Sequence, residues 1–276
     1  MKQLIRGNLR IEDRGPAAYV WSSLAHYGLR ALLPKRSRDT TVVMNEYNHE
    51  RDEYWKPQHQ LSVDDYVWGD RERERWILLD HELGRGTLRQ VRERLLPRLK
   101  QRVEQYSAPG DLVVEFGAGT GRNLAYLSLE LPDRKYLGLE LTPRSVDDAH
   151  AMLRRFGLPV EMRVADVTAA LDVPRAAVAY SVQALEQLPS TVSRAALANM
   201  AKIASRAIIC FEPIRELFPK NMRGFAARLR QYRADYLSGL PQHARELGLD
   251  VVTAKLAGFA EHPLNELSEL VIELHP

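Results

Sequence analysis

Three glycines and one glutamate lie within the stretch VVEFGAGTGRN, residues 113–123, and form the first group that could do chemistry. Gly117, Gly119 and Gly121 follow a short apolar run and precede a segment of helical composition. Because glycine lacks a Cβ atom, such a turn lets a ligand lie against the backbone at the amino end of a helix. Glu115 adds a carboxylate two residues before the first glycine. The stretch therefore predicts a site for a ligand that needs both a close backbone and a nearby negative charge.

Two classes of ligand favour such a glycine turn: dinucleotides and S-adenosylmethionine. The dinucleotide fingerprint is G-x-G-x-x-G, and here Arg122 occupies the position of its third glycine. A carboxylate at Glu115 would also repel a pyrophosphate, whereas it would attract the α-ammonium group of a methionine moiety. These residues therefore favour S-adenosylmethionine and disfavour a nicotinamide oxidoreductase.

Further acidic residues follow the glycine turn in a recognisable order. Glu140 ends the run YLGLE, Asp166 lies in VADV, and Glu186 lies in SVQALEQL. With these motifs, residues 111–213 resemble the class I S-adenosylmethionine-dependent methyltransferases. The resemblance implies that Glu140 binds both ribose hydroxyls, for which a carboxylate is suited because it accepts two hydrogen bonds, and that Asp166 holds the adenine amino group. The full cofactor-binding set that it implies is Glu115, Gly117, Gly119, Gly121, Asn123, Glu140, Leu141, Asp166, Val167 and Ser181.

The segment around Glu186 departs from the family pattern, because Gln187 replaces a histidine that is common there. Methyl transfer from a sulfonium is an in-line displacement, and the protein contributes mainly by holding acceptor, methyl and sulfur collinear. A hydroxyl acceptor also needs a base, whereas an amine needs only to arrive deprotonated. Candidate bases are Glu186, His262 and His49, and an ordinary structural role stays open for each.

Two segments outside the core of the predicted fold are candidates for binding the acceptor. The first is a cluster of aromatic residues and one histidine within residues 45–55, which we expect either to cover the cofactor or to form a local core. The second is the insert 212–240, whose apolar residues recur every three or four positions and predict a helix with one apolar face docked on the domain. The residues of the first cluster are Tyr47, His49, Tyr54 and Trp55.

Arginines occupy much of the remaining surface of that insert. Arg223 and Arg230 lie two helical turns apart and are predicted to point together toward the cleft. Guanidinium groups so placed would bind a phosphate or a carboxylate, which predicts an anionic acceptor. The alternative is a basic face exposed to solvent.

The elements that must position these residues alternate along the chain. Strands that alternate with helices indicate a parallel sheet with helices on both faces. We therefore expect an α/β fold with a doubly wound, mostly parallel seven-stranded sheet, the Rossmann-like methyltransferase fold that the resemblance implies. Residues 1–85 are irregular in pattern and are expected to form an N-terminal extension that covers the active site. Residues 86–276 are expected to form the cofactor-binding domain, with 212–240 as a lid-like insert.

Composition narrows the classes of function. The 276 residues are 45% hydrophobic and carry a net charge of only +3, without the basic stripe expected of a nucleic-acid-binding protein. The single cysteine, Cys210, lies in an apolar run and indicates a reduced, cytoplasmic protein, and no residues have the spacing of metal ligands. Residues 17–33 are apolar but too short and too polar to span a bilayer. A helix on a membrane surface fits this segment, and a helix packed on the main domain is favoured.

These observations predict an S-adenosylmethionine-dependent methyltransferase that acts on a small molecule, such as a saccharide or a secondary metabolite, by O- or N-methylation. One alternative keeps the cofactor and changes the acceptor to protein or RNA. Another is a non-catalytic binding module built on a methyltransferase fold. The acceptor, the general base and the oligomeric state are not specified by these motifs.

Overall fold

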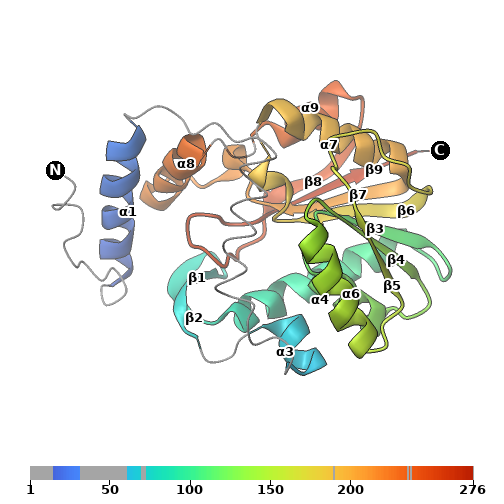
Figure 1. Ribbon diagram of the computed structural model, residues 1–276. Helices are drawn as coiled ribbons and strands as arrows, with labels where there is room; N and C mark the ends of the chain where they lie inside the picture. Colours follow the sequence, from blue (N-terminus) through green and yellow to red (C-terminus); the bar gives the residue numbers. More distant parts are fainter. Residues whose placement is uncertain are drawn as a thin grey trace.

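A seven-stranded sheet forms the centre of the computed structural model, which describes residues 15–31, 61–69, 73–188, 190–234, 236 and 238–275 (Figure 1). The strand order is β5-β4-β3-β6-β7-β9-β8. The first five of these strands pair in parallel, and β9 runs antiparallel to both β7 and β8. The strands are β3 Leu112–Phe116, β4 Lys135–Glu140, β5 Val160–Val164, β6 Ala176–Val182, β7 Ala204–Glu212, β8 Asp250–Leu256 and β9 Ser268–Glu273.

The order in which successive strands are added to the sheet reverses at β3, which pairs in parallel with β4 on one side and with β6 on the other. Open α/β sheets bind their ligands at such a switch point, beyond the carboxyl ends of the strands. The observed order and pairing confirm the predicted fold class. The expected ligand edge is therefore the one where β3, β4 and β6 end.

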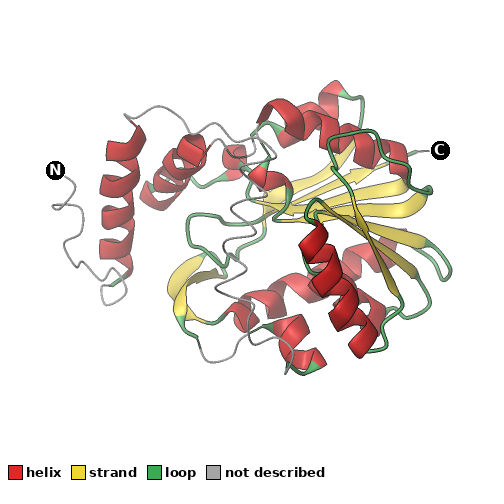
Figure 2. Cartoon of the chain, viewed as in Figure 1, coloured by secondary structure: helices red, strands yellow, loops and turns green. Residues whose placement is uncertain are grey.

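Helices cover both faces of the sheet (Figure 2). Successive side chains of a strand point to opposite faces, so Val113 packs into the core on one face and Val114 into the core on the other. The first face is covered by α4 Leu88–Tyr106, α5 Arg122–Glu130 and α6 Pro143–Arg155, and the second by α7 Ser190–Ile203 and α9 Leu240–Glu246. Two short 3-10 helices, Leu185–Gln187 and Arg215–Leu217, follow β6 and β7.

In the N-terminal extension, α1 Pro16–Ala31 lies where a helix was expected. The extension also contains elements that its sequence did not reveal, namely α3 Val63–Trp68 and a hairpin of β1 Arg75–Leu79 with β2 Glu82–Gly86. The hairpin escaped prediction because its turn residues, Asp80 and His81, adopt left-handed backbone angles (φ 51° and 68°) without glycine. Leu78 exchanges two backbone hydrogen bonds of 3.0 Å with Ala260, so the hairpin is tied to the loop between β8 and β9.

Helix α8, Met222–Ala234, lies beside α1 and presents the opposite face from the one expected (Figure 1). Small residues are buried, and Gly224 approaches the chain so closely that a Cβ atom there would lie 1.9 Å from the carbonyl oxygen of Pro219. The apolar stripe that was expected to dock faces solvent instead, since Met222, Phe225 and Tyr232 are about half exposed. α1 does pack on another helix of the protein, and no helix among the described residues is long and apolar enough to cross a membrane.

Gly138 of β4 provides a test of this packing. A Cβ atom there would lie 2.4 Å from the sulfur of Met162 and 2.8 Å from the Cβ of Ala118. We expect Gly138→Ala to lower the free energy of unfolding by about 1–3 kcal/mol, the usual cost of overpacking a core. Gly84→Ala in β2 is the matched control, because nothing lies within 4 Å of the added atom. If urea denaturation gave the same loss in free energy of unfolding for both variants, the described packing of β4 would be contradicted.

Candidate active site

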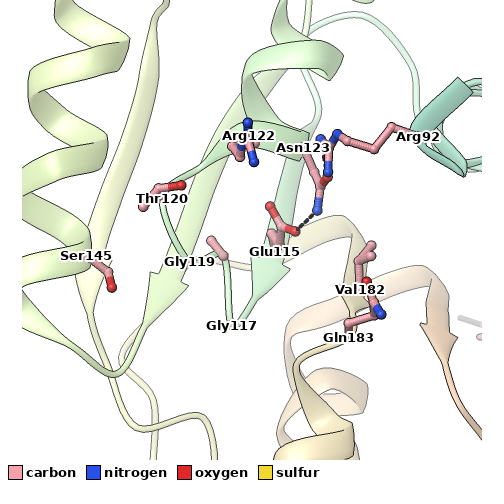
Figure 3. A pocket seen from close by; sticks show the side chains of 11 residues that line it. Arg92, Glu115, Gly117, Gly119, Thr120, Arg122, Asn123, Ser145, Val182 and Gln183 are labelled. Carbon is pink, nitrogen blue, oxygen red and sulfur yellow. Dashed lines mark hydrogen bonds between the residues drawn. The ribbon is translucent and has the colours of Figure 1, made fainter. Parts of the chain in front are cut away.

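A hollow of about 220 Å³ opens at the carboxyl ends of β3 and β6, at the switch point of the sheet (Figure 3). Its wall combines the glycine turn with side chains from α4, α5 and the end of β6. It is lined by Arg92, Glu115, Gly117, Ala118, Gly119, Thr120, Arg122, Asn123, Ser145, Val182 and Gln183.

The glycine turn presents bare backbone to this hollow. Gly117, Gly119 and Gly121 all have positive φ angles, of 71°, 55° and 80°. At Gly117 a Cβ atom would lie 2.3 Å from the Cβ of Ala184, whereas at Gly119 nothing lies within 4 Å of the corresponding position. Gly117 is therefore needed for packing against the segment after β6, and Gly119 leaves open space for a ligand.

Glu115 is a buried carboxylate on the wall of the hollow. Its side chain is 1% exposed and accepts hydrogen bonds from Asn123 Nδ2 at 2.7 Å and from the Tyr180 hydroxyl at 3.0 Å. Burial raises the pKa of Glu115 to about 8, although both of these hydrogen bonds favour the ionised form. Asn123 and Glu115, both predicted to bind the cofactor, are thus brought together.

Arg92 places a buried cation beside this carboxylate, and sequence reasoning missed it. Its guanidinium donates to Asn123 Oδ1 at 3.0 Å (Figure 3). It also donates to the carbonyl oxygen of Val67 at 2.5 Å. Burial lowers the pKa of Arg92 to about 10, which leaves it charged at neutral pH. The signal in the sequence was an arginine on the apolar face of α4, between Leu88 and Leu95. Asn123 therefore joins an acidic and a basic group at one end of the hollow.

Glu140, at the end of β4, holds the glycine turn. It is 7% exposed, and its Oε2 accepts a hydrogen bond from the amide of Gly119 at 2.9 Å. Its Oε1 accepts from both the amide and the hydroxyl of Thr142, at 3.0 Å and 2.8 Å. The predicted ribose-binding acid is therefore directly connected to the predicted methionine-binding turn.

The remaining predicted cofactor residues lie at or near strand ends but outside the lining of this hollow. Asp166 is half-buried after β5, and its Oδ1 accepts hydrogen bonds from the amide and hydroxyl of Thr168 at 2.9 Å and 2.6 Å. Leu141 and Val167 are half-buried neighbours of the two acids. Ser181 is fully buried within β6, and the wall of the hollow is formed there by Val182 and Gln183.

Glu212 holds the backbone of the segment after β6, and sequence reasoning did not identify this carboxylate. It is fully buried at the end of β7 and accepts hydrogen bonds from the amides of Ala184, Leu185 and Glu186 at 3.0, 3.1 and 3.0 Å. Burial raises the pKa of Glu212 to about 7, against the effect of these backbone donors. Glu212 therefore fixes the backbone that carries Glu186.

Glu186, a candidate base, is connected to α8 through the loop between β8 and β9. Its Oε2 accepts a hydrogen bond from Asn265 Nδ2 at 3.0 Å, and Asn265 Oδ1 accepts one from Arg230. Arg223 instead forms an ion pair of 2.7 Å with Glu266, whose side chain is 1% exposed. Both guanidinium groups therefore have partners within the protein, and the binding of an anionic acceptor by them stays a prediction.

His262 is poorly suited to be a base. Its Nδ1 accepts a hydrogen bond from the amide of Leu264 at 3.2 Å, and burial, together with nearby Arg230, lowers the pKa of His262 to about 3. The other predicted acceptor-side residues, Tyr47, His49, Tyr54 and Trp55, lie outside the described residues. Within the described part of the chain, no group of three or more histidine, cysteine or acidic residues could hold a metal ion.

Helix α3 fastens part of the N-terminal extension to the glycine turn. The Tyr66 hydroxyl donates to the carbonyl oxygen of Thr120, and the Arg122 guanidinium donates to the carbonyl oxygens of Tyr66 and Asp65. Arg122, which breaks the dinucleotide fingerprint, thus has a structural contact in this fold. The segment around α3 supports the hollow from the side of α5.

Residues 113–206, from β3 into β7, match a family model described as a methyltransferase domain. The match includes the glycine turn, Glu140, Asp166 and Glu186. A search of curated proteins found no match to the sequence.

Solved structures share this fold at low sequence identity. Magnesium protoporphyrin IX methyltransferase from Synechocystis PCC 6803, crystallised with bound SAH, has a TM-score of 0.59 and 14% identity, over 86% of this chain and 100% of that one. An O-methyltransferase family protein from Burkholderia thailandensis has a TM-score of 0.57 and 14% identity, over 94% and 71%. The 4+2 cyclase SpnF has a TM-score of 0.59 and 14% identity, over 87% and 97%. These similarities show the fold alone, and the cyclase shows that the fold does not by itself specify the reaction.

The role of Glu212 can be tested through stability. Glu212→Ala would leave three buried amides without their acceptor, and we expect it to lower the free energy of unfolding by about 3 kcal/mol or more. Glu216→Ala is the matched control, because Glu216 is exposed and accepts a single amide hydrogen bond, from Gly239 at 2.9 Å. Denaturant unfolding should give a change below about 1 kcal/mol for the control. Equal losses in the two variants would show that Glu212 does not organise this segment.

Proposed function

We propose that this chain, a class I S-adenosylmethionine-dependent methyltransferase by its domain family and fold, transfers a methyl group to a small-molecule acceptor at the carboxyl edge of its sheet. The observation that carries the proposal is the pairing of Glu115 and Arg92 through Asn123 beside an open glycine turn. An amino acid has an ammonium group and a carboxylate a few atoms apart, and this wall offers one partner for each.

The proposed cofactor site follows the order of the strand ends. Glu115 binds the α-ammonium group of the methionine moiety, and Arg92 binds its carboxylate. Glu140 binds the ribose hydroxyls, since each of its oxygens can accept further hydrogen bonds beside those from Gly119 and Thr142. Asp166 binds the adenine amino group through Oδ2, which has no hydrogen bond among the described residues, while Oδ1 is held by Thr168.

The cofactor, when bound, supplies an electrophilic methyl group on a sulfonium, and the protein contributes position and charge. The glycine turn lets the methionine moiety approach the backbone at the amino end of α5. Buried carboxylates at the ends of β3, β4 and β7 favour a cationic ligand over an anionic one. Alignment of the acceptor with the methyl group is then the main contribution to rate.

The proposed acceptor side is formed by Glu186 and the residues that hold it. Glu186 follows β6, its backbone is fixed by Glu212, and its side chain is held by Asn265. A carboxylate in this place would accept a proton from a hydroxyl acceptor or orient an amine. The loop between β8 and β9, which carries Asn265, is tied to the β1–β2 hairpin and so links the acceptor side to the N-terminal extension.

The proposal predicts that the protein binds S-adenosylhomocysteine and transfers a labelled methyl group from S-adenosylmethionine to a fraction of small metabolites. Glu140→Ala should weaken S-adenosylhomocysteine binding by about 1.5–3 kcal/mol in calorimetry, because a charged hydrogen-bond acceptor is lost. Glu130→Ala, at an exposed position at the end of α5, is the control and should bind normally. Transfer only to protein or RNA fractions would show that the acceptor is a protein or an RNA and not a small molecule. Binding without any transfer would indicate a non-catalytic module.

The role of Glu115 predicts a release of protons on binding. With a pKa of about 8, Glu115 is mostly neutral at pH 7, and pairing with an ammonium group favours its ionised form. Binding of S-adenosylhomocysteine at pH 7 should therefore release close to one proton, and affinity should rise from about pH 6 to 8, until the amine of the ligand itself deprotonates. Calorimetry in buffers of different ionisation enthalpy measures this release.

Two variants test whether Glu115, and not another acid, releases the proton on binding. Glu115→Gln should bind more weakly and release no proton, because the amide does not titrate. Asp166→Asn should weaken binding but keep the proton release. Proton release that persists in Glu115→Gln would show that another group faces the ammonium.

A further inference from the structure

Helices α1 and α8 each carry an apolar stripe on a face that is open to solvent. On α1 the stripe consists of Ala17, Trp21, Ala25 and Leu29, spaced four residues apart and all exposed, with Trp21 64% and Leu29 71% exposed. On α8 it consists of Met222, Phe225, Leu229 and Tyr232, of which three are about half exposed. Residues spaced in this way lie on one side of a helix.

These stripes are not needed to hold the two helices on the protein. The helices pack through other residues, which include Leu24 and Tyr27 of α1 and Ala226 and Ala227 of α8. Five of the eight large hydrophobic side chains that are exposed among the described residues lie on these two helices. Such a concentration of exposed apolar surface indicates a site of interaction.

The charge around these stripes is one-sided. Residues 16–31 and 220–234, which include the two helices, contain six of the 39 basic residues of the chain and none of its 36 acidic residues. The rest of the chain is therefore net negative. Arg223 is paired with Glu266, whereas Arg228 donates to the carbonyl oxygens of Phe218 and Pro219 and Arg230 to the side-chain oxygen of Asn265. Within the described part of the chain, neither Arg228 nor Arg230 forms an ion pair with a carboxylate.

This charge distribution favours an anionic lipid surface over a second copy of the chain as the partner of the two helices. A second copy docked through the same face would bring two segments of like charge together, which is unfavourable. An anionic lipid surface would attract the basic segments and accept the tryptophan, phenylalanine, tyrosine and leucine side chains at its interface. In Figure 1 α8 lies between α1 and the sheet, so the pair stands at the outside of the protein, where a flat surface can reach it.

We propose that α1 and α8 form a docking surface for an anionic lipid membrane, with the apolar stripes at the interface and the basic segments beside the lipid headgroups. This surface is independent of the proposed methyl transfer, since none of its stripe residues lines the hollow at β3 and β6.

The test is flotation of the full chain with vesicles of phosphatidylcholine, either pure or mixed with phosphatidylglycerol. We expect binding to the mixed vesicles only, and a decrease of that binding as salt screens the charges. The double variant Trp21→Ser with Phe225→Ser should lower the bound fraction by about tenfold, because it removes one large exposed aromatic side chain from each helix.

A matched control is Leu129→Ser with Val252→Ser, which removes two apolar side chains that are 48% and 45% exposed on α5 and β8. The control should float as the unchanged protein does, and both variants should still bind S-adenosylhomocysteine if the chain does. Equal flotation of the two double variants would overturn the proposal, as would failure of the unchanged protein to bind mixed vesicles. Dimerisation in sedimentation velocity that only Trp21→Ser with Phe225→Ser abolishes, without vesicle binding, would assign the surface to a second copy instead.

Discussion

Glu140 accepts a hydrogen bond from the amide of Gly119, and the geometry of the candidate site depends on this contact. It joins the end of β4 to a turn in which three glycines adopt left-handed backbone angles. Thr142 holds the other oxygen of the carboxylate, and Tyr66 of α3 donates to the turn from the opposite side. A turn of this kind has little stability of its own, so it keeps its shape because neighbouring elements satisfy its polar groups.

The carboxyl edge of the sheet concentrates buried acids. Glu115 lies one residue before the end of β3, Glu140 and Glu212 are the last residues of β4 and β7, and each of the three is less than 10% exposed. Burial raises the pKa of Glu115 and of Glu212, and the charge of Glu140 raises that of Glu115 further. Arg92 is the buried cation that opposes this charge. An edge with this balance favours a ligand that carries positive charge and one carboxylate, in agreement with the cofactor proposed for it.

In an amphipathic helix the large apolar side chains usually make the packing contacts, but in α8 they do not. Its glycine and alanine residues make the close contacts, and its arginines reach inward to Glu266, Asn265 and backbone carbonyl oxygens. Several of its large apolar side chains are left exposed to solvent. The inward arginines connect this helix to the loop that holds Glu186, so the same element faces both the candidate site and the exterior.

The sequence by itself determined the alternation of strands and helices, the glycine turn and the acids near the ends of β3, β4 and β5, because these features are local. A strand followed by a turn shows in the apolar pattern, and a parallel sheet then brings the carboxyl ends together. Only the tertiary structure decided the places of Arg92, Glu212 and Asn265, whose partners lie far away in the chain. It also decided which face of α8 is buried. A stripe of apolar residues shows that a helix has two different faces, but the neighbouring elements determine which face packs against them. In α8 the small residues pack more closely than the apolar stripe would.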